Sequence, residues 1–339
     1  KEKELTVVER SIHREPFYER AKTFKLPITR IIALDDNDGE PLRLLGAEDL
    51  VVGVGTSLVT HPIILPEMSK LPTVGSGFGA GIDYEKVISL EPDLFMAVAA
   101  WPLKGLEEKL EPAGVQVLLL NFHVITETIE DVRKVGYLID KVDKAEEFAE
   151  FHDDAVDNIR ARTDGLSEDK KPLIFIINFW GYEGGIGLTT GKGTKHDYMC
   201  NYAGGINIAR DLGGSTKVDP EWVLEQNPDI IVTCVYGIGQ GYGAEDTTKM
   251  KAVRDEIMNL PGWDNIKAVK NGNVYIISTD LTQSGLIGFI ATAYWAKWFQ
   301  PDLFEDLDPE AIHQEYVDRF IRIDYDVKNG VFVYPPLGD

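Results

Sequence analysis

The sequence is poor in cysteine and in basic residues. Its two cysteines, Cys200 and Cys234, form no CxxC pair, which excludes a cysteine-based metal finger and a disulfide framework. We expect two buried thiols, with a disulfide between them as the alternative. Only 34 Lys and Arg stand against 56 Asp and Glu, so the net charge is −22. A surface of that sign repels phosphate backbones, and we expect no nucleic-acid partner.

The sequence also lacks the motifs of several large protein classes. No apolar run reaches the roughly 18–20 residues of a membrane span, and the charged start of the chain is not a signal peptide. Gly237, Gly239 and Gly241 follow a predicted strand, but Tyr242 stands where a dinucleotide fingerprint requires glycine. Gly193 replaces the Ser or Thr of a nucleotide-binding phosphate loop. The GxSxG and HExxH motifs are absent, which excludes the hydrolases and zinc proteases that carry them.

One segment of the chain is repeated. Glu85–Leu94 (EKVISLEPDL) matches Glu221–Ile230 (EWVLEQNPDI), with Glu, Val, Pro and Asp at the same positions in both copies. In each copy a short helix is predicted to end at Pro-Asp, and a continuous apolar run follows, as in a strand covered on both faces. A duplicated helix–strand unit predicts two related halves.

Apolar runs elsewhere extend both halves into alternating strands and helices. Strands are predicted at 30–34, 51–54, 94–98 and 114–120 in the first half, and at 173–177, 230–235 and 272–278 in the second. Strands that alternate with helices indicate an α/β fold. We predict two lobes, each with a mostly parallel open sheet flanked by helices, joined by one long helix.

The joining helix is predicted at about residues 144–166. Its apolar residues recur every three or four positions and form one stripe, which consists of Ala145, Phe148, Ala149, His152, Val156 and Ile159. The predicted division is an N-terminal arm at 1–29, a first lobe at 30–142, the helix at 143–169 and a second lobe at 170–339.

Glu85 and Glu221 occupy equivalent places in the two copies of the repeat. Each is predicted in the first turn of its helix, after the N-cap residues Asp83 and Asp219. The helix dipole favours a carboxylate there by about 0.3–1 kcal/mol, which is a sufficient structural reason for either glutamate. The alternative is that one exposed carboxylate per lobe docks an arginine-bearing partner.

Several segments, in their order along the chain, carry a resemblance to a known family. They are Arg30–Leu34, Leu44–Asp49, Val52–Val54, Pro72–Gly75, Asp83–Asp93, Ala203–Ala209, Asp219–Asp229, Ala268–Tyr275 and Trp298–Phe320. Together they resemble the substrate-binding proteins of ABC importers for iron–siderophore complexes, haem and cobalamin, whose two lobes are joined by a single long helix. Two segments depart from the family pattern, the arm at 1–27 and an insert at 178–202.

The resemblance implies an extracytoplasmic protein that is not an enzyme and has no cofactor. Such a protein captures a metal chelate between its lobes and delivers it to a permease and an ATPase in the membrane. The resemblance also implies that Glu85 and Glu221 pair with arginines of the permease. We expect a monomer, and a leader or anchor that the printed sequence does not contain.

Ligands of open α/β sheets bind beyond the carboxyl ends of the strands. Polar and aromatic residues that follow predicted strands are therefore the candidate ligand contacts. Thr56 and Ser57 are expected to supply hydroxyls, and Lys192, Lys195 and His196 are expected to supply cationic or donor groups. Flat faces for stacking are expected from Trp101, Trp180, Tyr182, Tyr236 and Tyr242.

The sequence constrains the ligand less than the transport role. A ferric siderophore is our first expectation, and cobalamin or haem would use the same aromatic residues. Glycine-rich loops also present N–H groups to anions, so an oxyanion such as molybdate or tungstate is an alternative. A competing class is a metal-binding enzyme or metallochaperone with His61, His123 and His196 as ligands.

Overall fold

The computed structural model describes residues 3–11, 17–76, 81–99, 105–122, 124–178, 186 and 188–337. The chain divides into two units. Unit 1 contains Lys1–Phe151 and Asp318–Ile323, and unit 2 contains His152–Val317 and Asp324–Asp339. Asp318–Ile323 thus belongs to unit 1, whereas the predicted division places it in the second lobe, 170–339.

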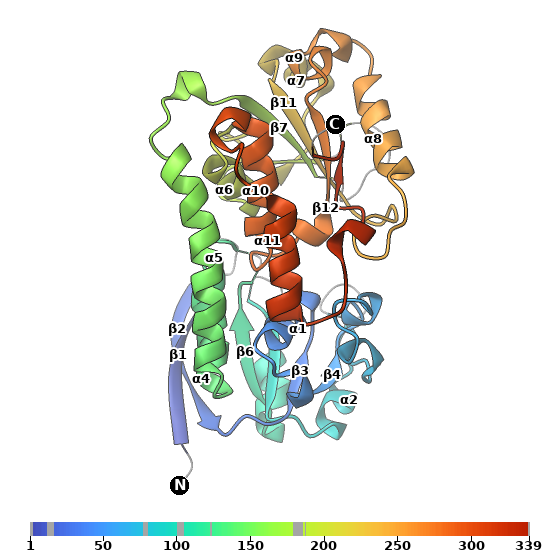
Figure 1. Ribbon diagram of the computed structural model, residues 1–339. Helices are drawn as coiled ribbons and strands as arrows, with labels where there is room; N and C mark the ends of the chain where they lie inside the picture. The colour runs from blue at the N-terminus through green and yellow to red at the C-terminus, as the bar shows by residue number, and fades with distance from the viewer. Residues whose placement is uncertain are drawn as a thin grey trace. The chain divides into compact units, whose positions relative to one another are not determined.

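Unit 1 is built on a four-stranded parallel sheet with the strand order β4-β3-β5-β6 (Figure 1). The strands are β3 (Ile31–Ala33), β4 (Val51–Val54), β5 (Leu94–Val98) and β6 (Gln116–Leu120). All four lie in runs that are predicted as strands. The helices described around this sheet are α1 (Asp36–Leu44), α2 (Tyr84–Ser89), α3 (Leu106–Leu110) and α4 (Thr128–Leu138). Side chains of the sheet such as Phe95 and Val117 pack with Val87 of α2 and with Leu106 and Leu110 of α3.

The N-terminal arm forms a β-hairpin in unit 1. Strands β1 (Lys3–Ser11) and β2 (Tyr18–Leu26) pair in antiparallel fashion as a separate two-stranded sheet. No strands are predicted there from the sequence. The reason is that the inner face carries Glu9 opposite Arg20 and Val7 opposite Lys22, which interrupts the apolar alternation that indicates a strand.

The long predicted helix is α5 (Val142–Thr163), whose 22 residues give a length of about 33 Å. Its predicted apolar stripe is confirmed, because every residue of the stripe is buried. The ring of Phe148 packs against Phe320 within unit 1, and the ring of His152 packs against Phe289 within unit 2, each with ring centroids 5.2 Å apart. The division between the units falls inside this helix.

Unit 2 is built on a seven-stranded sheet with the order β10-β8-β7-β11-β12-β13, in which β9 also pairs with β7. Its central strands β7, β11 and β12 are parallel, while β8, β10 and β13 add antiparallel edges. The strands are β7 (Leu173–Asn178), β8 (Leu188–Thr190), β9 (Ile206–Asn207), β10 (Ser215–Thr216), β11 (Ile230–Val235), β12 (Val274–Ser278) and β13 (Val333–Tyr334). The predicted parallel strands are therefore confirmed.

Helices cover both faces of this second sheet (Figure 1). They are α6 (Lys195–Tyr202), α7 (Pro220–Gln226), α8 (Thr248–Met258), α9 (Lys267–Lys270), α10 (Gly288–Phe299) and α11 (Pro309–Tyr316). Met250 and Val253 of α8 pack with Phe175 and Ile231 of the sheet. Helix α11 ends at Tyr316, and the chain continues as a π-helical turn over Val317–Ile321. Residues 324–337 then contain the short strand β13.

The two copies of the repeat lie in different sheets, since β5 belongs to unit 1 and β11 to unit 2. This confirms the predicted α/β fold with two parallel-rich sheets flanked by helices. Cys200 and Cys234 are both buried free thiols. Within the described ranges, we find no helix with the length and apolar character of a membrane span.

Candidate functional site

The first candidate edge lies in unit 1, where β3 and β4 end. β3 runs into Asp35, which caps α1: its carboxylate accepts the N–H of Asn37 at 3.1 Å, and Asp38 completes a capping box. β4 runs into Gly55, where a Cβ atom would lie 1.7 Å from the carbonyl oxygen of Leu34. Only glycine permits this approach of the two strand ends.

Thr56 and Ser57 follow directly at this edge. Thr56 is exposed, and Ser57 is half-buried. The Oγ of Ser57 accepts the N–H of Asp36 at 3.2 Å and lies 3.4 Å from Oδ2 of Asp35, to which it can donate. Ser57 thus fixes the start of α1, and Thr56 is the predicted hydroxyl that faces solvent. Their contact with a ligand stays a prediction.

The carboxylates at the start of α1 are the main feature that the sequence analysis missed. Burial, and then the charge of Asp36, raise the pKa of Asp35 to about 7. Burial also raises the pKa of Asp36 and of Asp38, and the latter lies well above its ordinary value. Nε2 of His61 lies 3.7 Å from Oδ2 of Asp36. The available signal was three acidic residues within 35–38, directly after a predicted strand.

The second candidate edge lies in unit 2, around the start of α6. Lys192 is exposed. Nζ of Lys195 donates to the carbonyl oxygen of Gln283. His196 is buried, and its ring stacks on Trp295 with centroids 6.3 Å apart. Burial lowers the pKa of His196 to about 3, so its ring is neutral at pH 7. Of the two predicted roles, a cationic group and a hydrogen-bond donor, only the donor role is compatible with a neutral ring.

The two predicted tyrosines after β11 differ in their surroundings. Tyr236 follows the strand directly and is 47% exposed. Tyr242 is half-buried: its hydroxyl lies 2.7 Å from Nε2 of His313, and its ring packs against Tyr325 and Phe332 with centroids 5.3 and 4.9 Å away. Tyr236 therefore presents a ring to solvent, whereas Tyr242 packs inside unit 2.

The glycine-rich loop that carries Tyr242 is fixed by the C-terminal segment. Gly241 donates to the carbonyl oxygen of Val331 at 2.6 Å and accepts from its N–H at 3.0 Å. A Cβ atom on Gly241 would lie 1.7 Å from Oδ2 of Asp280, and the φ angle there is +82°. The residue must be glycine, and the loop is held in one conformation.

Four of the predicted residues lie outside the described part of the chain: Trp101, His123, Trp180 and Tyr182. Among the described residues, no group of three or more His, Cys, Asp or Glu is arranged to hold a metal ion. Of the three histidines in the metal hypothesis, His61 is half-buried in unit 1 and His196 is buried in unit 2.

Glu85 and Glu221 are both exposed in the first turn of their helices. Asp83 caps α2 by accepting the N–H of Lys86 at 2.9 Å. Asp219 precedes α7, and Pro220 occupies its first helical position. The repeat therefore places one exposed carboxylate at the same point of each unit.

A model of the family described as "Periplasmic binding protein" matches residues 31–281, which include the strands of both units that carry these residues. The chain belongs to this family. A similar protein is the uncharacterized ABC transporter substrate-binding lipoprotein YvrC of Bacillus subtilis, which is 30% identical over 288 residues. The alignment covers 84% of this chain and 84% of that protein. A cobalamin-binding protein of Halobacterium salinarum is 27% identical over 214 residues, or 61% of this chain and 54% of that protein.

Solved structures of periplasmic binding proteins share the fold. The TroA-like periplasmic binding protein FepB of Veillonella parvula aligns with a TM-score of 0.79 and 24% identity, over 93% of this chain and 96% of that chain. MolA of Haemophilus influenzae, bound to molybdate, aligns with a TM-score of 0.72 and 18% identity, over 90% and 96%. This periplasmic binding protein is therefore the substrate-binding component of an ABC transporter: it is not an enzyme, and it works with a permease, an ATPase and a small ligand.

Proposed function

We propose that this periplasmic binding protein works outside the cytoplasm and captures a metal chelate with an organic shell. A ferric siderophore comes first, and cobalamin or haem second. The observation that carries the proposal is the exposed ring of Tyr236 at the carboxyl end of β11. Aromatic rings bind flat or apolar ligand faces, and they add little to the binding of a bare ion.

Polar groups of the two units support the same proposal. Thr56 is exposed after β4 in unit 1, and Lys192 in unit 2 is exposed after β8, which runs antiparallel to β7. A hydroxyl donates to the oxygen atoms of a chelate, and a lysine ammonium attracts any negative charge that the chelate carries. The cobalamin-binding protein among the relatives is consistent with a ligand of this kind.

An oxyanion such as molybdate is the second candidate. It is favoured by the similarity to MolA, which is bound to molybdate in its structure, and by the exposed ammonium of Lys192. Titration of the purified protein with a ferric siderophore, cyanocobalamin and sodium molybdate, followed by calorimetry, separates the two. We expect saturable binding of a chelate. Binding of molybdate alone contradicts the first candidate, and binding of none of the three contradicts both.

The permease contact is the second part of the proposal. We infer that Glu85 and Glu221 each receive an arginine of the permease, because both carboxylates are exposed at equivalent points of the two units. An arginine–carboxylate pair is bidentate and directional, so two such pairs define one orientation of the binding protein on its transporter.

A further inference from the structure

The N-terminal hairpin lies along β6, the edge strand of the sheet in unit 1. At the start of β6, the side-chain amide of Gln116 accepts the N–H of Lys25 at 2.6 Å and donates to its carbonyl oxygen at 3.1 Å. Near the end of β6, the carboxylate of Glu9 accepts the N–H of Leu119 at 2.9 Å. The hairpin thus runs beside the whole strand, and the end at which Ser11 pairs with Tyr18 lies at the carboxyl end of the sheet.

Several polar contacts hold this end of the hairpin. Glu9 is fully buried and pairs with Arg20 at 2.6 Å. The carbonyl oxygen of Arg10 accepts from the side chain of Asn121, the first residue after β6, and that amide also donates to Glu127 at 3.0 Å. Arg10 pairs in addition with Glu130 of α4. A buried, paired carboxylate fixes one register, because any other register leaves the charge unpaired.

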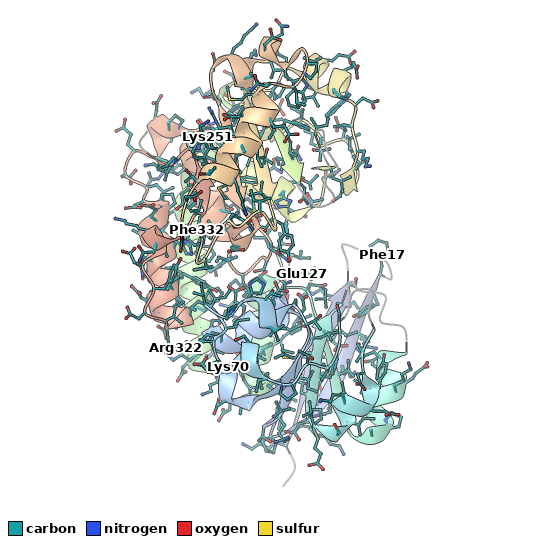
Figure 2. The ribbon with its side chains drawn as sticks, turned by 90° about the vertical axis from the view of Figure 1, so that its right-hand side faces the viewer. Phe17, Lys70, Glu127, Lys251, Arg322 and Phe332 are labelled. Atoms are coloured by element: carbon teal, nitrogen blue, oxygen red, sulfur yellow. The ribbon has the colours of Figure 1, made fainter. Side chains whose placement is uncertain are left out.

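These contacts hold Phe17 in an exposed position at the end of the hairpin. It directly precedes β2 and is 63% exposed, more than any other exposed large hydrophobic side chain in the described ranges. Figure 2 shows it at the end of the hairpin, at the same edge of unit 1 as Glu127. This is the edge at which Thr56 follows β4. Water therefore surrounds an apolar ring at the edge where the fold binds ligands.

The residues at this edge offer little to a small anion. Asp35, Asp36 and Asp38 gather where β3 ends, and Glu127 precedes α4. Their carboxyl groups present no cation to an oxyanion, and a phenyl ring offers it no hydrogen bond. A ring system with an apolar face gains from contact with the same ring.

We propose that Phe17 contacts the ligand and selects a chelate with an extended ring system, a tetrapyrrole or an aromatic siderophore, over a bare oxyanion. This inference rests on the proposed function. Phe17 acts as a specificity-determining residue on a segment outside the sheet. The buried Glu9 serves as its positioning residue, since it fixes the hairpin on β6.

The test compares Phe17→Ala with the matched control Tyr137→Ala. Tyr137 is also an exposed aromatic residue of unit 1, at 52%, but it lies nine residues into α4, about 14 Å along a helix that starts at this edge. Both side chains are exposed, so both variants are expected to fold. The melting temperature verifies this. The probes are cyanocobalamin, ferric enterobactin and sodium molybdate, titrated by calorimetry.

We expect the wild-type protein to bind cyanocobalamin or ferric enterobactin, and Phe17→Ala to bind the same probe about tenfold more weakly. Phe17→Tyr restores the affinity to within about threefold, and Tyr137→Ala leaves it within about twofold. Equal affinity of Phe17→Ala and the wild type overturns the inference and leaves the proposed function standing. Wild-type binding of molybdate alone overturns the ring-system ligand, and binding of no probe overturns the proposed function together with this inference.

Discussion

The carboxyl edges of the two sheets carry different chemistry, although each sheet contains one strand of the duplicated unit, β5 in unit 1 and β11 in unit 2. In unit 1 the edge holds the buried carboxylates of Asp35 and Asp38. In unit 2 it holds the exposed ring of Tyr236, which directly follows β11. The backbone of an α/β unit determines where a ligand can approach, while the residues that follow each strand determine which part of the ligand is recognised. The edge of unit 1 therefore holds carboxyl groups whose pKa values are raised by burial, whereas the edge of unit 2 offers the flat face of an exposed ring.

The largest expected effect concerns the acidic edge. The pKa of Asp35 is about 7 in the folded protein, against an ordinary value of 3.8. Between about pH 4 and 7 the folded state therefore keeps a proton that the unfolded chain has released, and the free energy of unfolding falls as pH rises. Asp35→Asn keeps an N-cap oxygen and removes this titration. We expect the variant to be more stable than the wild type at pH 8, on the order of 2 kcal/mol, with a shallower pH dependence.

Urea unfolding at pH 5 and pH 8 measures this effect. Asp83→Asn is the control, since Asp83 caps α2 at an exposed position. We expect it to change the free energy of unfolding by about 0.5 kcal/mol or less at either pH. If the free energy of unfolding changes between pH 5 and pH 8 by the same amount in Asp35→Asn as in the wild type, the buried cluster does not titrate as described.

A smaller effect separates the two tyrosines of unit 2. Tyr242→Phe removes the hydroxyl that bonds His313 and leaves Nε2 of this buried ring without that bond. We expect a loss of about 1 kcal/mol in the free energy of unfolding. Tyr236→Phe is the matched control, and we expect about 0.3 kcal/mol or less because its side chain is exposed. Thermal and urea unfolding measure both. An equal loss of unfolding free energy in the two variants would contradict the distinction between the packed ring of Tyr242 and the exposed ring of Tyr236.

The smallest effect on stability, with the most specific effect on transport, is expected at the repeated glutamates. We expect Glu85→Ala combined with Glu221→Ala to lower the free energy of unfolding by about 1 kcal/mol or less, because each change removes a carboxylate from the first turn of a helix. We expect the affinity for the ligand to stay unchanged. Stimulation of the ATPase activity of the importer in proteoliposomes is expected to be lost. Glu225→Ala, an exposed position later in α7, is the control. Full stimulation by the double variant would refute the docking role.

The parts of the fold that were predictable are those coded by local pattern. The strands β5 and β11 lie in continuous apolar runs after Pro-Asp, and α5 carries a clear apolar stripe. Helix α1 was not predicted, because it contains Gly39 and Pro41, both poor helix formers, and is stabilised by its capping box instead.

The hairpin and parts of the site were not predictable, because they are held by residues that lie far apart in the sequence. Arg20 and Lys22 of the hairpin pair with Glu107 of α3, so no local sequence pattern indicates strands there. The position of Tyr236 after a buried strand was visible in the sequence. The packing of Tyr242 was not, because His313 and Phe332 reach it only in the folded unit.

The central claim is that this protein holds a chelate and does not transform it. Native mass spectrometry of the protein purified from its own host measures this most directly, before and after incubation with the released ligand. The account predicts one intact chelate with an organic ring system per chain, recovered with unchanged mass. A bound bare oxyanion, or a chelate whose mass changes during incubation, would contradict it.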